Sequence, residues 1–412
     1  MQADPHPTPE RTAARAIFAA GLAAADPGGA VTAALADVPA PAGRRLIVAI
    51  GKAGVTMAAA ARATLGPCEA LVVTDDANAR PLPGAEVLAA GHPLPDARGA
   101  AAAQRVLAAA AMLGEGDQLL ALVSGGGSAL LPAPVAGVSL ADKIAVNRLL
   151  LASGADIAEM NLIRQALSRI KGGGLARAAA PAQVVALILS DVMGDDPQLV
   201  ASGPTAAPVG DAAAARAALA ARGLWPQLPP AVRAHLETAP PPPAPPVTEN
   251  RIIGSNALSV AAMARAAAAY GLPVHTATLT GDVQDAAARI AATGPGPGIW
   301  LWGGETTVRL SRQGEGGRNQ ELALRVALAG GAGRWAFLSA GTDGRDGPTD
   351  AAGGLVDAGT LPRIRAAGHD PAGLAADHDS RIALAAAGDL LITGGTGTNV
   401  ADLQVLVRGP LT

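Results

Sequence analysis

Three consecutive glycines between two serines form the segment of the chain best suited to bind an anion. Residues 123–129 read VSGGGSA and follow an apolar run. Successive backbone N–H groups at the start of a helix form a concave site that attracts phosphate or carboxylate oxygens. Three adjacent glycines cost conformational entropy, which favours a binding function over a purely structural loop. We therefore expect ligand contacts from Ser124, Gly125, Gly126, Gly127 and Ser128.

Lys52 lies in a second glycine-rich turn, Gly51-Lys52-Ala53-Gly54. The glycines let backbone N–H groups approach an anion, and the lysine adds a mobile positive charge. We take Lys52 as a candidate catalytic cation. An ordinary strand-to-helix turn with a solvated lysine explains these four residues equally well.

A polar helix face that ends in a lysine follows farther along the chain. Asn161, Gln165 and Ser168 recur at helical spacing, and Lys171 and Gly172 stand where the helix should end. Asn161, Lys171 and Gly172 are therefore further candidate ligands for a phosphate or a carboxylate. A plain capped helix end is the alternative explanation.

Asp191 stands two residues after the apolar run Val184–Leu189. A carboxylate at the end of a buried strand suits a general base, or a ligand for Mg²⁺, which is a hard cation that prefers oxygen. We expect Asp191 to take one of these roles. Helix capping or an Asx turn by the neighbouring Asp195 or Asp196 is the structural alternative.

Four glycine-rich segments in the second half of the chain carry acids, amides and hydroxyls in the same manner. These segments are residues 303–307, 316–321, 339–350 and 393–399. Single turns of this kind are weak signals, but their repetition at strand ends makes an anion site the best explanation. The expected binding residues are Gly304, Glu305, Thr306, Asn319, Thr342, Asp343, Gly395, Thr398 and Asn399.

Arg318 is the candidate catalytic cation of the second half. It should stand at a helix N-terminus, where its guanidinium can meet phosphate oxygens. Glu305, Asp343 and Asp346 are candidate Mg²⁺ ligands there, in addition to Asp191 in the first half.

Short strands that are apolar on both faces must position the loops of the first half. The expected strands are Leu46–Ile50, Ala70–Thr74, Leu119–Val123 and Val184–Leu189, with helix-like segments between them. This alternation predicts a doubly wound, Rossmann-like parallel α/β sheet. Ligands of such sheets gather at the carboxyl ends of the strands, where the polar loops lie.

A proline-rich segment divides the chain. Residues 239–248 read APPPPAPPVT, which suits an extended spacer, so we expect domains at residues 1–240 and 249–412. The second half predicts another α/β domain, whose last strands could return to the first domain. Its expected strands are Arg251–Ile253, Pro273–Leu279, Ile299–Trp302, Thr306–Leu310, Trp335–Ala340, Leu390–Thr393 and Gln404–Val407.

Composition excludes several classes of function. The 412 residues carry 31 Lys and Arg against 34 Asp and Glu, and this net charge of -3 provides no general attraction for nucleic acid or an anionic membrane. Cys68 is the single cysteine, which excludes a disulfide framework and fits a reducing cytoplasm. The polar N-terminus and the interrupted apolar stretches predict neither secretion nor membrane insertion.

Two common nucleotide-binding fingerprints are absent from the sequence. No G-x-x-x-x-G-K-[ST] motif occurs. The one G-x-G-x-x-[GA] match, residues 331–336, precedes an expected strand instead of following one, which is the wrong context for a dinucleotide site. Direct support for a nicotinamide cofactor is therefore missing.

The combined motifs resemble those of the glycerate 2-kinases whose C-terminal half is the MOFRL domain, a group often labelled hydroxypyruvate reductase of tartrate-utilisation operons. The resemblance covers nearly the whole chain. It includes the Gly51 turn, the 123–129 loop, Asn161 with Arg164, Lys171-Gly172, Ser190-Asp191, Gly304-Glu305-Thr306, Gly317-Arg318-Asn319, Thr342-Asp343 and Gly395-Thr396-Gly397-Thr398-Asn399.

The resemblance implies two α/β domains with the active site in the cleft between them. It implies phosphorylation of the 2-hydroxyl of D-glycerate by ATP and Mg²⁺, with 2-phospho-D-glycerate and ADP as products. In this scheme Lys52 bridges glycerate and the transferred phosphoryl group, Asp191 orients or deprotonates the hydroxyl, and Arg318 stabilises the developing charge. A cytoplasmic monomer or homodimer with no nucleic-acid or membrane partner is expected.

Two other functions are compatible with the sequence. An NAD(P)H-dependent hydroxypyruvate reductase fits the older family label, although the dinucleotide fingerprint is missing. A sensor that binds a sugar acid or a nucleotide without turnover is the second alternative.

Overall fold

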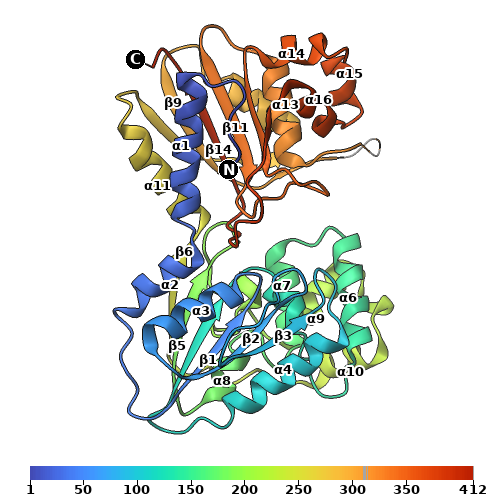
Figure 1. Ribbon diagram of the computed structural model, residues 1–412. Coiled ribbons are helices and arrows are strands. Elements are labelled where there is room, and N and C mark those ends of the chain that lie inside the picture. The colour runs from blue at the N-terminus through green and yellow to red at the C-terminus, as the bar shows by residue number, and fades with distance from the viewer. Residues whose placement is uncertain (310–311, 313, 412) are drawn as a thin grey trace. The chain divides into compact units, whose positions relative to one another are not determined.

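The computed structural model describes residues 1–309, 312 and 314–411, which fold into two compact units (Figure 1). The N-terminal unit is Pro27–Ile253, and the C-terminal unit joins Met1–Asp26 to Gly254–Thr412. Each unit contains a six-stranded sheet covered by helices. The expectation of two α/β domains is confirmed.

The sheet of the N-terminal unit has the strand order β3-β2-β1-β4-β5-β6. Strand β1 pairs in parallel with β2 and β4, and the parallel pairs β2–β3 and β4–β5 extend the sheet on both sides. The order therefore reverses between β1 and β4, which confirms a doubly wound sheet and marks where its ligands should bind. The strands are β1 (Arg45–Ile50), β2 (Glu69–Asp75), β3 (Glu86–Ala90), β4 (Gln118–Val123), β5 (Gln183–Leu189) and β6 (Thr248–Gly254).

Helices cover both faces of this sheet. The helices of this unit are α2 (Pro27–Leu35), α3 (Gly54–Leu65), α4 (Ala97–Ala110), α5 (Gly127–Leu130), α6 (Leu140–Ala152), α7 (Ile157–Ala166), α8 (Gly174–Ala179), α9 (Ala212–Ala221) and α10 (Pro230–Thr238), with 3-10 turns at Val200–Ser202 and Trp225–Gln227. Leu46, Val48 and Ile50 of β1 share a core with α4 and α8. The intervening Ile47 and Ala49 are buried as well, as expected for a strand covered on both faces.

Helices α6, α7, α9 and α10 form a smaller core of their own. Val146 and Leu150 of α6 pack there with Ile163 of α7. Asp156 and Glu159 form a capping box at the start of α7, in which each carboxylate accepts from the backbone N–H of the other residue. These contacts fix the polar side chains that α6 and α7 carry.

The sheet of the C-terminal unit has the order β13-β12-β11-β14-β9-β7. Only the pair β7–β9 is parallel among the pairings of this sheet that the structure describes, and the others are antiparallel. The strands are β7 (Val274–Thr278), β9 (Gly298–Gly304), β11 (Trp335–Gly341), β12 (Gly353–Asp357), β13 (Leu390–Leu391) and β14 (Asp402–Arg408), and β8 (Gly281–Asp282) pairs separately with β10 (Thr306–Thr307). Leu310, expected at the end of a strand, lies outside the described residues.

Two helical layers enclose this second sheet. The helices are α1 (Pro9–Ala23), α11 (Asn256–Ala268), α12 (Val283–Ala291), α13 (Arg318–Ala329), α14 (Thr360–Ala366), α15 (Pro371–Ala376) and α16 (Ser380–Ala387). Leu338 and Ala340 of β11 share a core with α1 and α11. Trp335 and Phe337 point to the other face and share a core with α12 and α13. This alternation is the two-residue period of a strand.

The contacts divide the chain differently from the expected domains 1–240 and 249–412. Helix α1 lies on the C-terminal sheet, where Ile17 and Phe18 join the core, so the first 26 residues belong to the C-terminal unit. Strand β6, expected in the second domain, extends the N-terminal sheet, and Ile252 packs against that core. The reason is that the apolar face of α1 is covered by the second sheet, whereas β6 completes the hydrogen bonding of β5.

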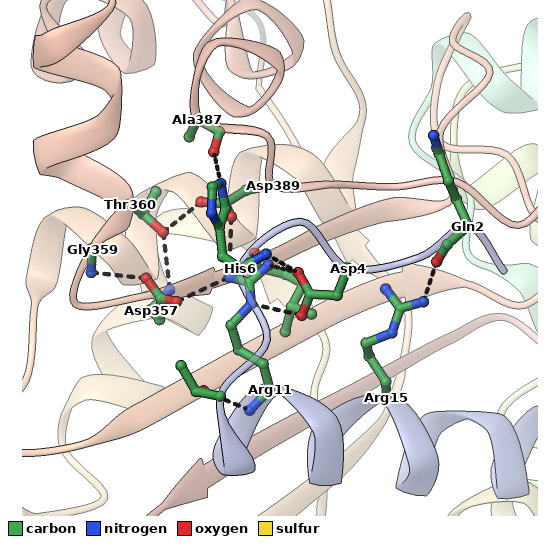
Figure 2. Close-up of polar contacts among 12 residues, drawn as sticks. Gln2, Asp4, His6, Arg11, Arg15, Asp357, Gly359, Thr360, Ala387 and Asp389 are labelled. Carbon is green, nitrogen blue, oxygen red and sulfur yellow. Dashed lines mark hydrogen bonds and ion pairs between the residues drawn. The ribbon is translucent and has the colours of Figure 1, made fainter.

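A buried arginine fastens the N-terminal segment to the C-terminal unit (Figure 2). Arg11 is 1% exposed and pairs with Asp4 at 2.8 Å, Asp389 at 3.0 Å and Asp357 at 3.1 Å. Its Nη1 also donates to the Leu355 carbonyl at 3.0 Å. Burial lowers the pKa of Arg11, but the bonds to these acids outweigh burial and raise the pKa overall. Arg11 therefore stays charged in the interior.

Among the helices that the structure describes, none alone is long and apolar enough to cross a membrane. The bent pair of α1 and α2 meets that criterion only when the two are taken together, by length and composition.

Candidate active site

Two loops meet where the strand order of the N-terminal sheet reverses. The backbone N–H of Lys52, after β1, donates to the Gly125 carbonyl, after β4, at 2.9 Å. The Ser124 hydroxyl donates to the Ile50 carbonyl at 3.1 Å and accepts from the N–H of Ala53 at 3.1 Å. Ser124 thus joins the two loops through their backbones.

Lys52, His92 and Asp191 surround the glycine loop that follows β4. A side chain at Gly125 would overlap the Asp191 carboxylate. A side chain at Gly126 would lie 3.3 Å from the His92 ring and 3.4 Å from Cγ of Lys52. Gly126 also has a φ of 87°, which favours glycine. The structure therefore brings two predicted side chains, Lys52 and Asp191, to one loop that only glycine can form.

A strained turn lies against the same loop. Ala201 and Ser202 have φ values of 51° and 61°, although neither is glycine. The Ser202 hydroxyl is 2.6 Å from the Ser128 hydroxyl, and the Gln165 amide donates to the Ser202 carbonyl at 3.2 Å. A Cβ at Gly127 would lie 2.7 Å from the Ala201 side chain, so that glycine serves packing. Strain of this kind persists where surrounding contacts enforce it, often at functional sites.

A cavity of about 210 Å³ lies beside the glycine loop within the N-terminal unit. Gly126 and Ser128 line it, together with Lys143 of α6, Arg164 of α7 and Lys171 after α7. Lys171 is 4% exposed, and its ammonium donates to the Ser128 carbonyl at 2.7 Å. Three of the predicted anion ligands, Gly126, Ser128 and Lys171, are therefore brought together here.

The pKa values of the cavity side chains are lowered in a consistent direction. Burial lowers the pKa of Lys143 to about 7, and the charge of Arg164 adds to that effect. Burial, followed by the charges of Lys143 and Arg164, lowers the pKa of Lys171 well below its ordinary value. Burial and the charge of Lys52 lower the pKa of His92. Burial is the main cause in all three cases, and neighbouring positive charges act in the same direction.

Asn161 and Gly172, also predicted as anion ligands, do not line this cavity. Asn161 is buried on α7, where its Nδ2 donates to the Ile157 carbonyl at 2.9 Å. Gly172 has a φ of 52°, and its N–H donates to the Ser202 carbonyl at 3.1 Å. Gly172 therefore shapes the turn that carries Lys171.

In the C-terminal unit, Arg318 is the first residue of α13, as the sequence predicts, and it pairs with two acids. One is Glu305, and the other is Asp402, whose Oδ1 lies 3.4 Å from Nη2 of Arg318. Burial raises the pKa of Asp402 to about 7 despite the charge of Arg318. Gly304 of β9 stands opposite Asp402 of β14 in the sheet, which brings the two acids to the same arginine.

Asp346 and Asn319 make internal contacts at the start of α13. The Oδ1 of Asp346 accepts from the N–H of Asn319 at 3.0 Å, and Oδ2 accepts from the N–H of Gln320 at 2.8 Å and from its side-chain amide at 3.0 Å. The Asn319 amide oxygen accepts from the Ser339 hydroxyl at 2.6 Å. Since protein donors occupy both oxygens of Asp346, it holds the helix start and does not fit the role of Mg²⁺ ligand.

The predicted loops 339–350 and 393–399 lie side by side. The Thr342 hydroxyl donates to the Ala401 carbonyl at 2.6 Å and accepts from the N–H of Val400 at 2.8 Å. The N–H of Thr396 donates to the Asp343 carbonyl at 3.3 Å. Thr342 therefore joins the loops, whereas the Asp343 carboxylate accepts from the N–H two residues on at 3.0 Å.

The other predicted residues of this unit lie at the ends of β9, β10 and β14. Gly304 has a φ of 148°, and a side chain there would overlap the backbone after β7. Thr306 and Thr398 are buried, and their hydroxyls have no hydrogen-bond partner within the described ranges. Gly395 has open space around it, and the Asn399 side chain accepts from the N–H two residues on at 3.3 Å.

The sequence motifs do not single out Lys143 or Asp402. Lys143 occurs within the ordinary helix α6, and Asp402 is the first residue of an apolar strand. Neither residue belongs to a short motif, because only the packing of α6 on α7 and the register of β9 with β14 brings them to their sites. A charged residue at a strand start was the available signal for Asp402.

Comparisons with known proteins identify relatives along most of the chain. The chain matches the models described as "Domain of unknown function (DUF4147)" at residues 13–237 and "MOFRL family" at residues 298–402. It is 40% identical over 380 residues to the D-glycerate 2-kinase of Thermotoga maritima, covering 88% of this chain and 90% of that protein. It is 44% identical over 425 residues to an Agrobacterium vitis protein provisionally named hydroxypyruvate reductase, covering 97% and 94%. The crystal structure of glycerate kinase from T. maritima matches with a TM-score of 0.90 and 37% identity over 97% of this chain and 99% of that one.

Proposed function

This chain belongs to the family of glycerate kinases built from the DUF4147 and MOFRL domains, and we propose that it is a glycerate 2-kinase. Its reaction is the transfer of the γ-phosphoryl group of ATP to the 2-hydroxyl of D-glycerate, which gives 2-phospho-D-glycerate and ADP. The observation that carries this proposal is the match to the D-glycerate 2-kinase of T. maritima along most of both chains.

The glycine loop after β4 is the proposed centre of the reaction. Phosphoryl transfer depends on positioning and on cations and N–H donors around the transferred group more than on covalent chemistry. Lys52 would neutralise charge on that group, and Asp191, beside Gly125, would orient or deprotonate the 2-hydroxyl. Arg318 is the proposed catalytic cation of the C-terminal unit, where Glu305 and Asp402 pair with its guanidinium.

Mg²⁺ is the proposed cofactor because the reaction moves a highly charged phosphoryl group. Within the described residues, no group of three or more His, Cys, Asp or Glu could hold a metal ion. Mg²⁺ commonly binds through one or two carboxylates and the phosphates of its substrate. Asp191, Glu305 and Asp343 are the proposed carboxylates, and the bound ion would neutralise phosphate charge.

The test is direct identification of the product. Purified protein is incubated with ATP, Mg²⁺ and D-glycerate, and phosphorus NMR distinguishes 2-phosphoglycerate from 3-phosphoglycerate. Formation of the 2-phospho isomer supports the proposal, and absence of any phosphoglycerate from folded protein contradicts it.

The A. vitis relative makes NAD(P)H-dependent reduction of hydroxypyruvate the second candidate. The turn after β1 reads Gly51-Lys52-Ala53-Gly54, which lacks the glycine spacing of a dinucleotide fingerprint. A parallel assay that follows NADH with hydroxypyruvate separates the two reactions. Oxidation of NADH without phosphoglycerate would favour the reductase.

A further inference from the structure

Three basic side chains line the cavity beside the glycine loop, and none of them faces a pairing carboxylate among the described residues. Lys143 donates to the Leu167 carbonyl at 2.9 Å, and Lys171 donates to the Ser128 carbonyl at 2.7 Å. Arg164 donates to the Asn147 amide oxygen at 2.6 Å from Nη2. None of the three forms an ion pair with a carboxylate in the part of the chain that the structure describes.

Such an arrangement is costly unless an anion binds. Removing a charge from water carries a penalty that an opposite charge must offset, and like charges repel each other. The lowered pKa values of Lys143 and Lys171 have this origin, namely burial and the neighbouring cations. A carboxylate or phosphate in the cavity would relieve both effects at once.

The size of the cavity selects among anions. Its volume of about 210 Å³ is below the roughly 300–1,000 Å³ of most ligand pockets. It therefore suits an acid of three or four carbons and is too small for a whole adenine nucleotide. Pro93 and Pro132 form apolar walls that can cover a short carbon chain.

The position of the cavity also favours a short acid over a nucleotide as its ligand. It shares Gly126 with the loop around which Lys52 and Asp191 lie. An acid whose carboxylate enters the cavity would therefore keep its neighbouring carbon close to that loop, which is where a 2-hydroxyl must be phosphorylated.

We propose that this cavity binds the carboxylate of the short 2-hydroxy acid substrate through Arg164, Lys143 and Lys171, and so selects the phosphoryl acceptor independently of the nucleotide. The proposal rests on the proposed function for the identity of the acid. Arg164 would provide the planar, two-point contact that a carboxylate favours, and the two lysines would complete the charge.

Calorimetric binding of D-glycerate and, separately, of Mg²⁺–ADP tests this assignment in the full-length protein. Arg164→Gln and Lys143→Met should each weaken D-glycerate binding by about tenfold or more, and Mg²⁺–ADP binding should stay within about twofold. Arg148→Gln is the matched control, because Arg148 is exposed on α6 and is not part of the cavity lining. It should leave both affinities unchanged. Circular dichroism checks that each variant is folded, and two variants guard against one of them failing to fold.

The outcomes separate the inference from the proposed function. Unchanged D-glycerate binding in both folded variants would overturn the inference even if the wild type makes 2-phosphoglycerate. Weaker Mg²⁺–ADP binding with unchanged D-glycerate binding would assign the cavity to phosphate and would also overturn it. Specific loss of D-glycerate binding would support the inference even if the wild type proved to be a reductase, because the acid is bound in either reaction.

Discussion

The two units of the molecule surround their basic side chains in opposite ways. In the C-terminal unit, Arg11 has three carboxylates within 3.1 Å and is fully enclosed by the protein (Figure 2). In the N-terminal unit, Lys143, Arg164 and Lys171 gather around one cavity and bond to neutral oxygens. The arginine of the first group is paired with carboxylates of the protein, whereas the basic side chains of the second group form no such pair within the described residues.

This difference distinguishes a structural ion pair from a binding site. Burial acts on both groups, but the acids around Arg11 raise its pKa overall, whereas the lysines of the cavity have lowered pKa values. A charge that the protein itself compensates contributes to folding. A partly buried basic group without a protein carboxylate beside it lowers the stability of the fold. Binding of an anionic ligand is the simplest explanation for keeping such a group.

Arg11→Met should have the largest effect on stability. It leaves the buried Asp389 and Asp357 with less compensation, and breaking a buried ion-pair network costs about 3–5 kcal/mol. Urea unfolding followed by tryptophan fluorescence measures the loss of stability, since Trp300, Trp302 and Trp335 all report on the C-terminal unit. Arg15→Met on the same helix is the control. A loss below about 1 kcal/mol for Arg11→Met would contradict the structural role.

Lys52→Met should have the next largest effect, on the rate and not on stability. Loss of a cation aimed at the transferred phosphoryl group should lower kcat by roughly 10²–10³-fold. The free energy of unfolding should change by about 0.5 kcal/mol or less, as for most substitutions outside the core. Steady-state kinetics and urea unfolding measure the two quantities. An unchanged kcat would remove Lys52 from the mechanism.

Lys143→Met should stabilise the ligand-free protein at pH 7, by about 1 kcal/mol. The pKa of Lys143 is lowered to about 7 in the fold, so the unfolded chain binds its proton more tightly and wild-type stability rises with pH above 7. The gain from the substitution should therefore shrink as the pH approaches the ordinary lysine value of about 10.4. Thermal unfolding of the variant and the wild type at pH 7 and pH 10 measures the difference in stability at each pH. A destabilised variant at pH 7 would mean that Lys143 is a structural group like Arg11.

Arg148→Gln should have the smallest effect of all. Its side chain is exposed on α6, so the free energy of unfolding should change by about 0.5 kcal/mol or less and kcat should be unchanged. The same assays measure both quantities. A larger effect would show that any positive charge on α6 affects stability or rate. The effects of Lys143 and Arg164 could then not be attributed to their place in the cavity.

The sequence predicts much of the N-terminal sheet and its glycine loops, because these depend on local patterns. The apolar runs of β1, β2, β4 and β5 are visible without a structure. Strand β3 was missed because Glu86–Ala90 contains two alanines and a single β-branched residue. The glycines at 125 and 126 were recognised, and the structure adds the side chains that require them.

Features that depend on packing between distant segments could not be predicted in this way. The apolar face of α1 does not indicate which sheet will cover it, so the sequence does not show that the first 26 residues belong to the C-terminal unit. The sequence likewise does not indicate that Lys143 lines the cavity, because only the packing of α6 on α7 brings it there. Asp346 was expected to bind Mg²⁺, but an acidic loop residue and a helix-capping acid look alike in sequence.

Proton uptake on binding of D-glycerate tests the central comparison most directly. At pH 8 Lys143, with a pKa of about 7, is mostly neutral, and Arg164, Lys171 and His92 face the same cavity. A carboxylate there would raise the pKa of Lys143, so binding should take up as much as about one proton. Calorimetry in two buffers of different ionisation enthalpy measures this number. We predict uptake in the wild type that is reduced in Lys143→Met, and binding without uptake would contradict the account.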